Sequence, residues 1–217
     1  MINMLKVLAA PGPVSYPMIA ATMRNHDILI DFGKEGKADV ILDSTVSLVR
    51  RGLRLDYITI KGLMVVSPDI GNRMGVWRKG SAADVLTRAL LDKKGLKSQL
   101  VYSDDMGKLK EMLQNGEVDS IVVASVISKG KTFEELLGIP GSCGVHVNGD
   151  REGFISAYQE GIDIMKQDPQ GSAEYVMKRL PVQVNPKMIS DLPKVVTLLI
   201  ERTSDYSDFE QLVKRYI

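Results

Sequence analysis

The chain has 217 residues, 44% of them hydrophobic, which is enough for one large domain or two smaller lobes with buried cores. The 28 Lys and Arg residues nearly balance the 27 Asp and Glu residues, and the net charge of +1 gives no electrostatic argument for binding to nucleic acid or to an anionic membrane. The one cysteine, Cys143, excludes a disulfide within the chain and is expected to be a buried, inert thiol.

The amino-terminal residues predict a strand and not a targeting segment. Residues 1–18 (MINMLKVLAAPGPVSYPM) hold only a short apolar run before the Pro-Gly-Pro turn, and this run is too short for a secretory signal peptide or a membrane-spanning helix. We therefore expect a cytoplasmic protein, with no leader and no lipid-anchor cysteine, whose first strand covers residues 5–10.

The first half of the fold is predicted to alternate between strands and helices. We expect strands over residues 5–10, 27–30 and 39–42 and helices over residues 16–24 and 46–51. Ser15 is placed to cap the first helix, with Pro17 in its first turn, and Ser44 can cap the second. Asp43 either caps as well or accepts a hydrogen bond from an amine or hydroxyl group of a ligand, and the sequence leaves both roles open.

The next stretch predicts a strand pair and a hinge. Residues 56–60 and 63–66 are typical of two strands joined by a turn at Lys61 and Gly62, which would form the edge of the first lobe. Residues 67–72 (SPDIGN) have the composition of a turn, so they are a candidate hinge crossing into a second lobe.

The second lobe is predicted to repeat the pattern, with strands over residues 74–77, 99–102 and 120–124 and helices over residues 82–91 and 106–113. Ser81 followed by Asp84 resembles a capping box. Gly80 lets the backbone approach a ligand, while Arg78 and Lys79 add positive charge beside a helix N-terminus. This turn is the strongest candidate anion site, although a Gly-Ser pair is common at such turns and neither a Walker A nor a dinucleotide-binding motif is present.

Two segments of the chain are similar to each other. In residues 36–44 (GKADVILDS) and 116–125 (GEVDSIVVAS), a glycine is followed by an acidic residue and a short apolar run. They indicate the last strands of two βαβαβ halves, or they are what any connection from a helix to a buried parallel strand contains. In the duplicated fold, the loops PGPVSY, DST and RKGSAA and the end of VVAS would meet in one cleft, because ligands of parallel sheets bind beyond the carboxyl ends of the strands.

The remainder of the chain predicts a return to the first lobe. Residues 125–131 are a candidate second hinge crossing, followed by a helix over residues 133–137 and a strand over residues 143–147. We then expect only helices packed on lobe one, beginning at Asp150, Ser172, Pro186, Pro193 and Ser204. The predicted organisation is lobe one in residues 1–70, lobe two in residues 71–126, and a return to lobe one with C-terminal helices in residues 127–217.

No motif for catalysis or metal binding is visible. His26 and His146 lie far apart in the sequence, no HExxH, CxxC or HxH pattern occurs, and there is no Gly-x-Ser-x-Gly nucleophile motif. We therefore expect neither a metal nor another cofactor, and no motif argues for an enzyme.

The layout of these segments resembles a known fold. The first strand with its PGPVSY loop, the ADV strand, GVWRKGSAADVLTRALL and LKEMLQNGEVDSIVVAS resemble the type II periplasmic-binding-protein fold. They look most like the nitrate, sulfonate and thiamine-precursor branch of the solute-binding proteins of ABC transporters. The chain also resembles a family of unknown function related to solute-binding lipoproteins. The resemblance covers nearly the whole chain and implies an α/β, two-lobed fold with a helical C-terminal extension packed on lobe one.

Local sequence and this resemblance together give a set of candidate ligand contacts. They are Ser15, Tyr16, Asp43, Ser44, Thr45, Arg78, Gly80, Ser81, Ala82 and Ser125. The resemblance implies a small solute, often anionic or heteroaromatic, which is held in a cleft between the lobes as they close. We expect an intracellular solute-binding or sensor-like protein without catalytic activity.

Two other functions stay open, because a fold does not determine a function. Similar cytoplasmic proteins include lyases of menaquinone biosynthesis and enzymes of thiamine-pyrimidine synthesis, for which Asp43 and Tyr16 are the candidate acid or base. A non-binding oligomeric scaffold would fill its cleft with bulky apolar side chains. Expected partners are a small-molecule ligand and, as an open option, a second copy in a homodimer. Nucleic acid, membrane insertion and, without a leader, a transporter permease are not expected.

Overall fold

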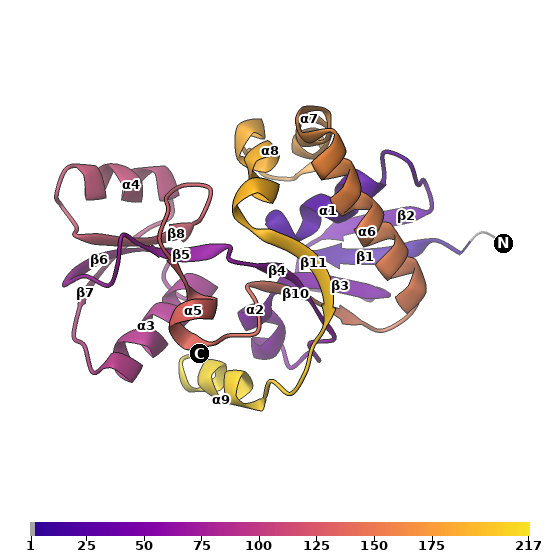
Figure 1. The fold of residues 1–217 in the computed structure, drawn as a ribbon. Coiled ribbons are helices and arrows are strands. Elements are labelled where there is room, and N and C mark those ends of the chain that lie inside the picture. Colours follow the sequence, from indigo (N-terminus) through magenta and orange to yellow (C-terminus); the bar gives the residue numbers. More distant parts are fainter. Residues whose placement is uncertain (1–2) are drawn as a thin grey trace. The chain divides into compact units, whose positions relative to one another are not determined.

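Two β-sheets, each with its own helices, organise the chain (Figure 1). The computed structural model describes residues 3–217. Unit 1 comprises Met1–Lys61 and Cys143–Ser204, and unit 2 comprises Gly62–Ser142 and Asp205–Ile217. The chain therefore passes from one unit to the other after Lys61, after Ser142 and after Ser204.

The sheet of unit 1 has the strand order β11-β4-β10-β3-β1-β2. Its strands are β1 (Leu5–Ala9), β2 (Ile28–Phe32), β3 (Val40–Ser44), β4 (Tyr57–Lys61), β10 (Cys143–Val147) and β11 (Thr197–Arg202). β1 pairs in parallel with β2 and β3, whereas β10 pairs antiparallel with β3 and β4. The nearly continuous apolar runs of β1 and β3 fit this arrangement, because parallel strands inside a sheet are buried on both faces.

Helices cover both faces of this sheet (Figure 1). They are the 3-10 helix η1 (Pro13–Ser15), α1 (Tyr16–Ala21), α2 (Thr45–Arg50), α6 (Arg151–Gln167), α7 (Pro169–Arg179) and α8 (Pro186–Val195). α6 packs so closely on α1 that a Cβ atom at Gly161 would lie 1.6 Å from the carbonyl oxygen of Pro17. The buried Tyr158 of α6 donates a 2.9 Å hydrogen bond from its hydroxyl to the carbonyl oxygen of Val14. These contacts fix the loop that follows β1.

The sheet of unit 2 has the strand order β7-β6-β8-β5-β9. Its strands are β5 (Met64–Ser67), β6 (Arg73–Trp77), β7 (Gln99–Ser103), β8 (Ser120–Ala124) and β9 (Lys131–Thr132), and its helices are α3 (Ala82–Lys94), α4 (Met106–Gln114), α5 (Phe133–Leu137) and α9 (Ser207–Arg215). β6 pairs in parallel with β7 and β8, and β5 pairs antiparallel with β8 and β9. The parallel part of each sheet therefore has the same order, with the first strand in the middle and the second and third on its two sides.

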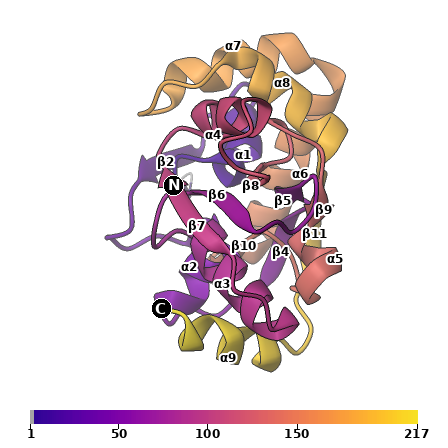
Figure 2. The same cartoon turned by 90° about the vertical axis from the view of Figure 1, so that its left-hand side faces the viewer.

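α3 and α4 cover opposite faces of the unit 2 sheet (Figure 2). Under α4, the fully buried Leu109 packs with Val65, Val118, Ile121 and Val123. Because α4 lies so close to β6, a Cβ atom at Gly75 would approach the Leu109 side chain to 2.9 Å. Burial of this apolar surface stabilises unit 2 independently of the turns that follow its strands.

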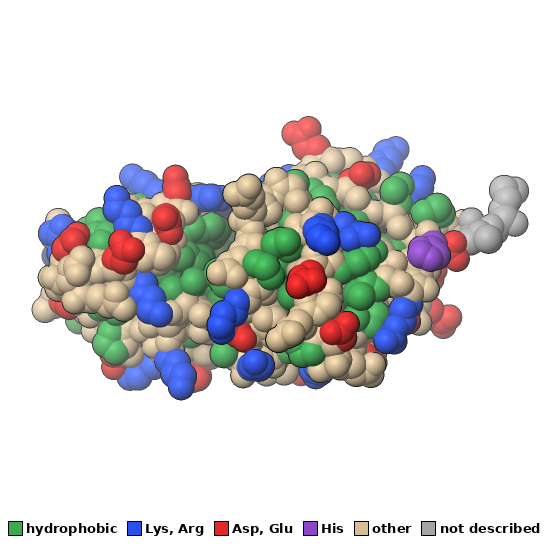
Figure 3. All heavy atoms as spheres, turned by 90° about the horizontal axis from the view of Figure 1, so that it is seen from above, with side chains coloured by type: hydrophobic (Ala, Val, Ile, Leu, Met, Phe, Trp, Pro, Cys, Tyr) green, Lys and Arg blue, Asp and Glu red, His purple; other side chains and the backbone are tan. Residues whose placement is uncertain are grey.

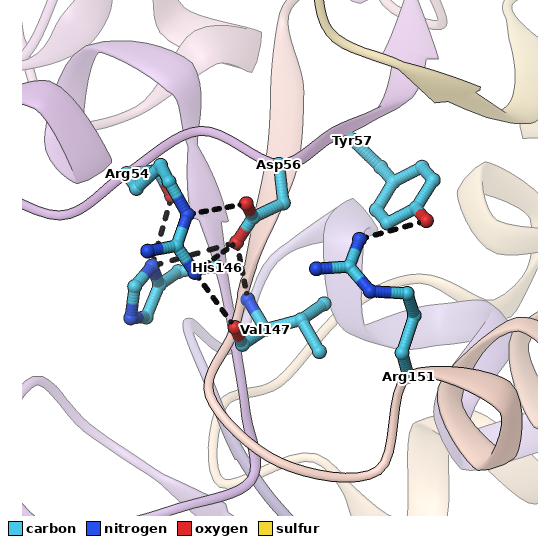
Figure 4. A network of polar contacts seen from close by, with 6 residues as sticks. All are labelled: Arg54, Asp56, Tyr57, His146, Val147 and Arg151. Carbon is cyan, nitrogen blue, oxygen red and sulfur yellow. Dashed lines mark hydrogen bonds and ion pairs between the residues drawn. The ribbon is translucent and has the colours of Figure 1, made fainter.

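A network of polar side chains lies at the start of β4, in the sheet of unit 1 (Figure 4). The guanidinium group of Arg54 donates to both carboxylate oxygens of Asp56, at 2.6 and 3.3 Å, and to the carbonyl oxygen of Val147 at 3.1 Å. Asp56 also accepts the backbone N–H of Val147 at 2.8 Å, and Nδ1 of His146 lies 3.6 Å from its carboxylate. The network joins the start of β4 to the end of β10, away from the carboxyl ends of β1 and β3.

Charged side chains of both signs are interspersed over the face shown in Figure 3, without a large area of one sign. Among the helices of residues 3–217, none combines the length and hydrophobicity that crossing a membrane requires.

The predicted elements are mostly present, with ends shifted by a few residues. The predicted bounds of Ser120–Ala124, Phe133–Leu137 and Cys143–Val147 agree with the structure. The two halves with parallel strands are also found, although no helix connects β2 to β3 in the first half, whereas α4 connects β7 to β8 in the second. The duplicated arrangement is thus better supported than an accidental similarity of two strands.

The predicted strand pair over residues 56–66 is wrong, because β4 belongs to the sheet of unit 1 and β5 to that of unit 2. β5 pairs with β8, so the chain joins unit 2 directly after Lys61. The predicted hinge segments, residues 67–72 and 125–131, consequently lie inside unit 2. The unit bounds fall after residues 61 and 142, and not after residues 70 and 126 as expected.

The C-terminal region differs from the prediction in three respects. The helix expected over residues 193–201 is wrong: α8 ends at Val195, and the next residues form β11, which gains a hydrogen-bonded partner in β4. α7 is capped by Asp168, which accepts the N–H of Gly171, and not by Ser172. α9 belongs to unit 2, so only part of the C-terminal region packs on the first sheet.

Candidate functional site

The loops after β1 and β3 lie side by side at one edge of the unit 1 sheet. The backbone N–H of Ala10, directly after β1, donates a 2.9 Å hydrogen bond to the carbonyl oxygen of Leu42 in β3. The loop after β1 continues through η1, which contacts β3, into α1, while β3 continues directly into α2. The structure therefore brings together the candidate residues of these two loops at the carboxyl ends of parallel strands, where ligands of such sheets bind.

Tyr16, the first residue of α1, is held at this edge with only 5% of its surface exposed. Among residues 3–217, no group forms a hydrogen bond with its hydroxyl. Burial raises the pKa of Tyr16 from its ordinary value of 10.0 to about 12. The phenol is thus protonated at neutral pH, so it can donate a hydrogen bond and is not available as a base.

The neighbouring hydroxyl groups of unit 1 bond to the backbone. Ser15 is buried and donates its hydroxyl proton to the carbonyl oxygen of Gly12 over 2.7 Å, so it does not cap α1 as predicted. Ser44 does cap α2, because its Oγ accepts the N–H of Ser47 over 3.0 Å. Thr45 is buried in the first turn of α2. A ligand at this edge would find Ser15 and Ser44 already bonded within the protein.

Asp43, in β3, is buried and holds α2 in place. Its carboxylate accepts hydrogen bonds from the Ser47 hydroxyl at 2.6 Å, the Arg51 guanidinium at 3.1 Å and the Ser44 N–H at 2.7 Å. Of the two roles left open by the sequence, these contacts favour the structural one. A carboxylate that already receives these donors is also poorly suited to act as a general base.

A corresponding edge exists in unit 2, at the carboxyl ends of β6, β7 and β8. The backbone N–H of Arg78, after β6, donates a 2.9 Å hydrogen bond to the carbonyl oxygen of Ser103 at the end of β7. Arg78 and Gly80 have φ angles of 40° and 81°, which direct the chain into α3. Ser81 caps this helix, as predicted, while Ala82 is its first residue.

Asp84, in the first turn of α3, is only 2% exposed and is the centre of a polar cluster. It accepts the N–H of Gly80 at 2.8 Å, the hydroxyl of Tyr102 at 2.7 Å and Nε of Arg88 at 3.3 Å. Burial and, secondly, the hydrogen bond to Asp84 raise the pKa of Tyr102 to about 12. The positive end of α3 therefore already faces a carboxylate of the protein itself, which weakens the case for an anion bound at Gly80.

The basic side chains of this turn lie against aromatic rings. The guanidinium carbon of Arg78 is 4.7 Å from the centroid of the Trp77 ring, and Nζ of Lys79 is 5.9 Å from that of Tyr102. The side chain of Arg78 remains 57% exposed, and its contact with Asp104 is long, at 3.5 Å. The exposed guanidinium is therefore available to a ligand that carries negative charge.

Ser125 follows β8 at the same edge. Its backbone N–H donates a 2.7 Å hydrogen bond to the carbonyl oxygen of Leu63. Its Oγ is buried and has no hydrogen-bond partner within the part of the chain that the structure describes. A buried hydroxyl without a partner costs free energy, so a ligand that bonded to it would remove that cost.

The ten candidate residues divide between the two units. Unit 1 holds Ser15, Tyr16, Asp43, Ser44 and Thr45, and unit 2 holds Arg78, Gly80, Ser81, Ala82 and Ser125.

The residues that hold the two buried carboxylates, Asp43 and Asp84, are not among the candidates predicted from the sequence. Arg88 lies four positions after Asp84 in α3, a spacing that places both side chains on one face of the helix and could have indicated this contact. Asp43 lies in β3, so its contacts with Ser47 and Arg51 have no such helical signal. Tyr102 has no such signal, because it reaches Asp84 from a different element.

The chain matches a protein-family model and is similar in fold to solved structures. A family model described as "Protein of unknown function (DUF3834)" matches residues 4–198. No curated protein matches the sequence. A proposed nitrate transport protein from Thermoplasma volcanium is similar with a TM-score of 0.75 and 24% identity, over 97% of this chain and 91% of the other. An ABC transporter structure from Parabacteroides distasonis gives a TM-score of 0.66 and 15% identity, over 99% and 93% of the two chains.

At these identities the similarity concerns the fold alone. The chain has an α/β fold with two sheets, like that of the two-lobed periplasmic-binding-protein-like proteins, and this confirms the predicted fold class. One of these two structures is named as a nitrate transport protein and the other as an ABC transporter, and at these identities they do not establish the nitrate, sulfonate and thiamine-precursor branch for this chain.

Proposed function

Because the chain belongs to the DUF3834 family, whose function is unknown, and folds like solute-binding proteins, we propose that it binds a small polar or anionic solute and does not convert it chemically. The solute contacts the loops at the carboxyl ends of the parallel strands. Ligands of parallel sheets bind at this position for a general reason: the loops and helix N-termini there are free to vary while the strands hold them in place.

The observation that carries this proposal is the hydroxyl of Tyr16. The residue is 5% exposed, yet its hydroxyl has no hydrogen-bond partner among residues 3–217. Because the hydroxyl is not among the fully buried polar atoms that lack a partner, water reaches it, and a solute that accepts its proton would replace that water. Because its pKa is raised to about 12, Tyr16 offers a proton and needs an acceptor. Carboxylate, sulfonate, nitrate and heteroaromatic nitrogen groups all supply one.

Two features of unit 2 support a polar and preferably anionic solute. The buried Oγ of Ser125 is a second hydroxyl without a partner within residues 3–217. The exposed guanidinium of Arg78 provides a positive charge at the same edge of its sheet and lies over the ring of Trp77. Arginine in such a position forms paired hydrogen bonds with planar anions.

Binding without catalysis is favoured over an enzyme by the state of the two candidate catalytic groups. The carboxylate of Asp43 is bonded to Ser47 and Arg51, and the raised pKa of Tyr16 keeps its phenol protonated. Neither group has the properties of a general base at neutral pH.

A thermal-shift screen of the purified protein tests the proposal. The panel contains nitrate, sulfate, alkyl sulfonates, amino acids, pyrimidines and aromatic carboxylic acids. A solute present at about a hundred times its dissociation constant adds about 2.7 kcal/mol to the free energy of unfolding, which raises the melting temperature by several degrees. If no compound raises the melting temperature, the proposal of solute binding is wrong.

Calorimetry on variants then locates the site. Tyr16→Phe and Ser125→Ala each remove one hydroxyl, and we expect each to weaken binding of the stabilising solute about 5- to 10-fold, or more for a charged solute. Tyr216→Phe is the matched control, because it removes a hydroxyl that bonds to Asp92 at α3 and not at the candidate site. Equal affinity in Tyr16→Phe and in the native protein would place the solute elsewhere.

A further inference from the structure

Glu134, in the first turn of α5, occupies an unusual position among the carboxylates of the chain. It lies in unit 2, but it bonds to the residues at which the chain enters and leaves that unit. Its Oε1 accepts the backbone N–H of Gly62 at 2.9 Å and the hydroxyl of Ser142 at 2.6 Å. Gly62 is the first residue of unit 2 after β4, and Ser142 is the last before β10.

The contact is reinforced by a third hydrogen bond. Ser142 Oγ accepts the backbone N–H of Leu63 at 3.1 Å. Leu63 in turn accepts the N–H of Ser125 at its carbonyl oxygen, at 2.7 Å, and thereby connects to the end of β8. One carboxylate and one hydroxyl thus hold the incoming and outgoing segments at a fixed spacing and attach both to the sheet of unit 2.

The other carboxylate oxygen of Glu134 makes this arrangement unfavourable in free energy. Oε2 is buried and has no hydrogen-bond partner among residues 3–217, and no Lys, Arg or His side chain in that range forms an ion pair with Glu134. A partly buried, uncompensated carboxylate is costly. An apolar side chain would fill the space with less cost but would accept neither the Gly62 N–H nor the Ser142 hydroxyl.

The backbone at Gly62 is adapted to this contact. Its φ angle is 82°, in the left-handed region that favours glycine, and a Cβ atom there would lie 3.7 Å from the Thr132 side chain. The chain turns at this residue directly after leaving β4, and the turn is the point at which its N–H meets Glu134.

We propose that Glu134 is a latch, defined here with Gly62, Leu63 and Ser142, that fixes the first two connections between the units to unit 2. Bending between the units then occurs on the other side of the latch, at the peptide bonds after Lys61 and before Cys143. The latch makes the two connections move as one hinge instead of two independent linkers. This proposal concerns the connections alone and does not depend on the nature of any solute.

Hydrogen exchange of the protein tests the first part of the proposal, that Glu134 holds Gly62 and Leu63 in place. In Glu134→Ala we expect the amides of Gly62 and Leu63 to exchange about tenfold faster or more, because the first loses its acceptor and the second loses the oriented Ser142 hydroxyl. Amides of β1 and β6 should be unchanged. Glu135→Ala is the matched control, since it removes a carboxylate from the next, exposed position of α5. Unchanged exchange at Gly62 and Leu63 would overturn the proposal.

A distance measurement tests the second part. Spin labels at the exposed residues Lys110 of unit 2 and Lys178 of unit 1, in a Cys143→Ser background, report the distribution of distances between the units. We expect Glu134→Ala to widen this distribution and Glu135→Ala to leave it unchanged. Faster amide exchange with an unchanged distribution would mean that the contact is only local, and the latch would be rejected.

Ser142→Ala keeps the test decisive if Glu134→Ala does not fold. This variant leaves the Gly62 bond to Glu134 in place and removes the acceptor of the Leu63 N–H. We expect faster exchange at Leu63, a smaller change at Gly62 and a wider distance distribution. The same exchange and the same distribution as in the native protein would contradict the proposal.

Discussion

Tyr102 and Asp84 are joined across two elements of unit 2. The hydroxyl of Tyr102, in β7, donates a 2.7 Å hydrogen bond to a carboxylate oxygen of Asp84 in the first turn of α3. Asp84 is almost completely buried and also accepts the N–H of Gly80. The pair therefore ties the end of a strand to the start of a helix at the edge where the unit 2 candidate residues lie.

Tyr102→Phe should destabilise the protein by about 1–3 kcal/mol, because the variant removes a hydrogen bond to a buried carboxylate. Equilibrium unfolding in urea measures the change. A double-mutant cycle with Asp84→Ala isolates the pair, because alanine removes the acceptor. If the bond contributes as described, the sum of the two single losses will exceed the loss in the double variant. Strict additivity would show that the two side chains do not interact in solution.

Stability should fall in alkaline solution because of Tyr16. Its folded pKa of about 12 exceeds its ordinary value of 10.0, so the folded state keeps the proton longer than the unfolded state. The stabilisation that results from this pKa difference is fully present below the unfolded pKa and is lost as the pH rises through the folded pKa. The free energy of unfolding then falls by up to about 1.4 kcal/mol per pH unit. Urea unfolding between about pH 9 and about pH 11 measures this slope. Tyr16→Phe should show a shallower slope, and an equal slope would contradict the burial of the phenol.

Gly161→Ala should destabilise unit 1 by about 2 kcal/mol or more, although alanine is the better helix former. The new Cβ atom would lie 1.6 Å from the carbonyl oxygen of Pro17, so α6 and α1 would have to separate. Gly12→Ala is the control, because a Cβ atom there meets nothing within 4 Å. The melting temperatures of the two variants are compared, and similar values would mean that α6 and α1 are not in close contact.

Asp56→Ala should cost about 3 kcal/mol, since it leaves the N–H of Val147 without its acceptor and removes the two oxygens to which Arg54 donates, at a site where the Asp56 side chain is 8% exposed. Asp191→Ala removes a carboxylate that pairs with Lys187 and Lys194 on the surface, and it should change the stability by less than about 1 kcal/mol. Chemical denaturation of the two variants compares them directly. Equal losses would show that the network at the start of β4 is no more than a surface ion pair.

The elements themselves follow from local sequence. The apolar runs of β1, β3 and β8 and the caps at Ser44 and Ser81 depend on residues within a few positions of each other. The order of strand, loop and helix in each half follows as well. For this reason the α/β class, the duplicated halves and the loops that carry the candidate residues could be predicted without a structure.

Tertiary structure alone decided how these elements combine. β4 and β5 are neighbours in sequence, but they pair with strands about eighty and sixty positions away, and β11 is a strand only because β4 offers it a partner. The surroundings of the candidate residues also depend on distant segments. Asp84 accepts a hydrogen bond from Tyr102 of another element, whereas no described residue forms a hydrogen bond with the Tyr16 hydroxyl. Burial and long-range hydrogen bonds depend on residues far apart in the chain, and no local pattern specifies them.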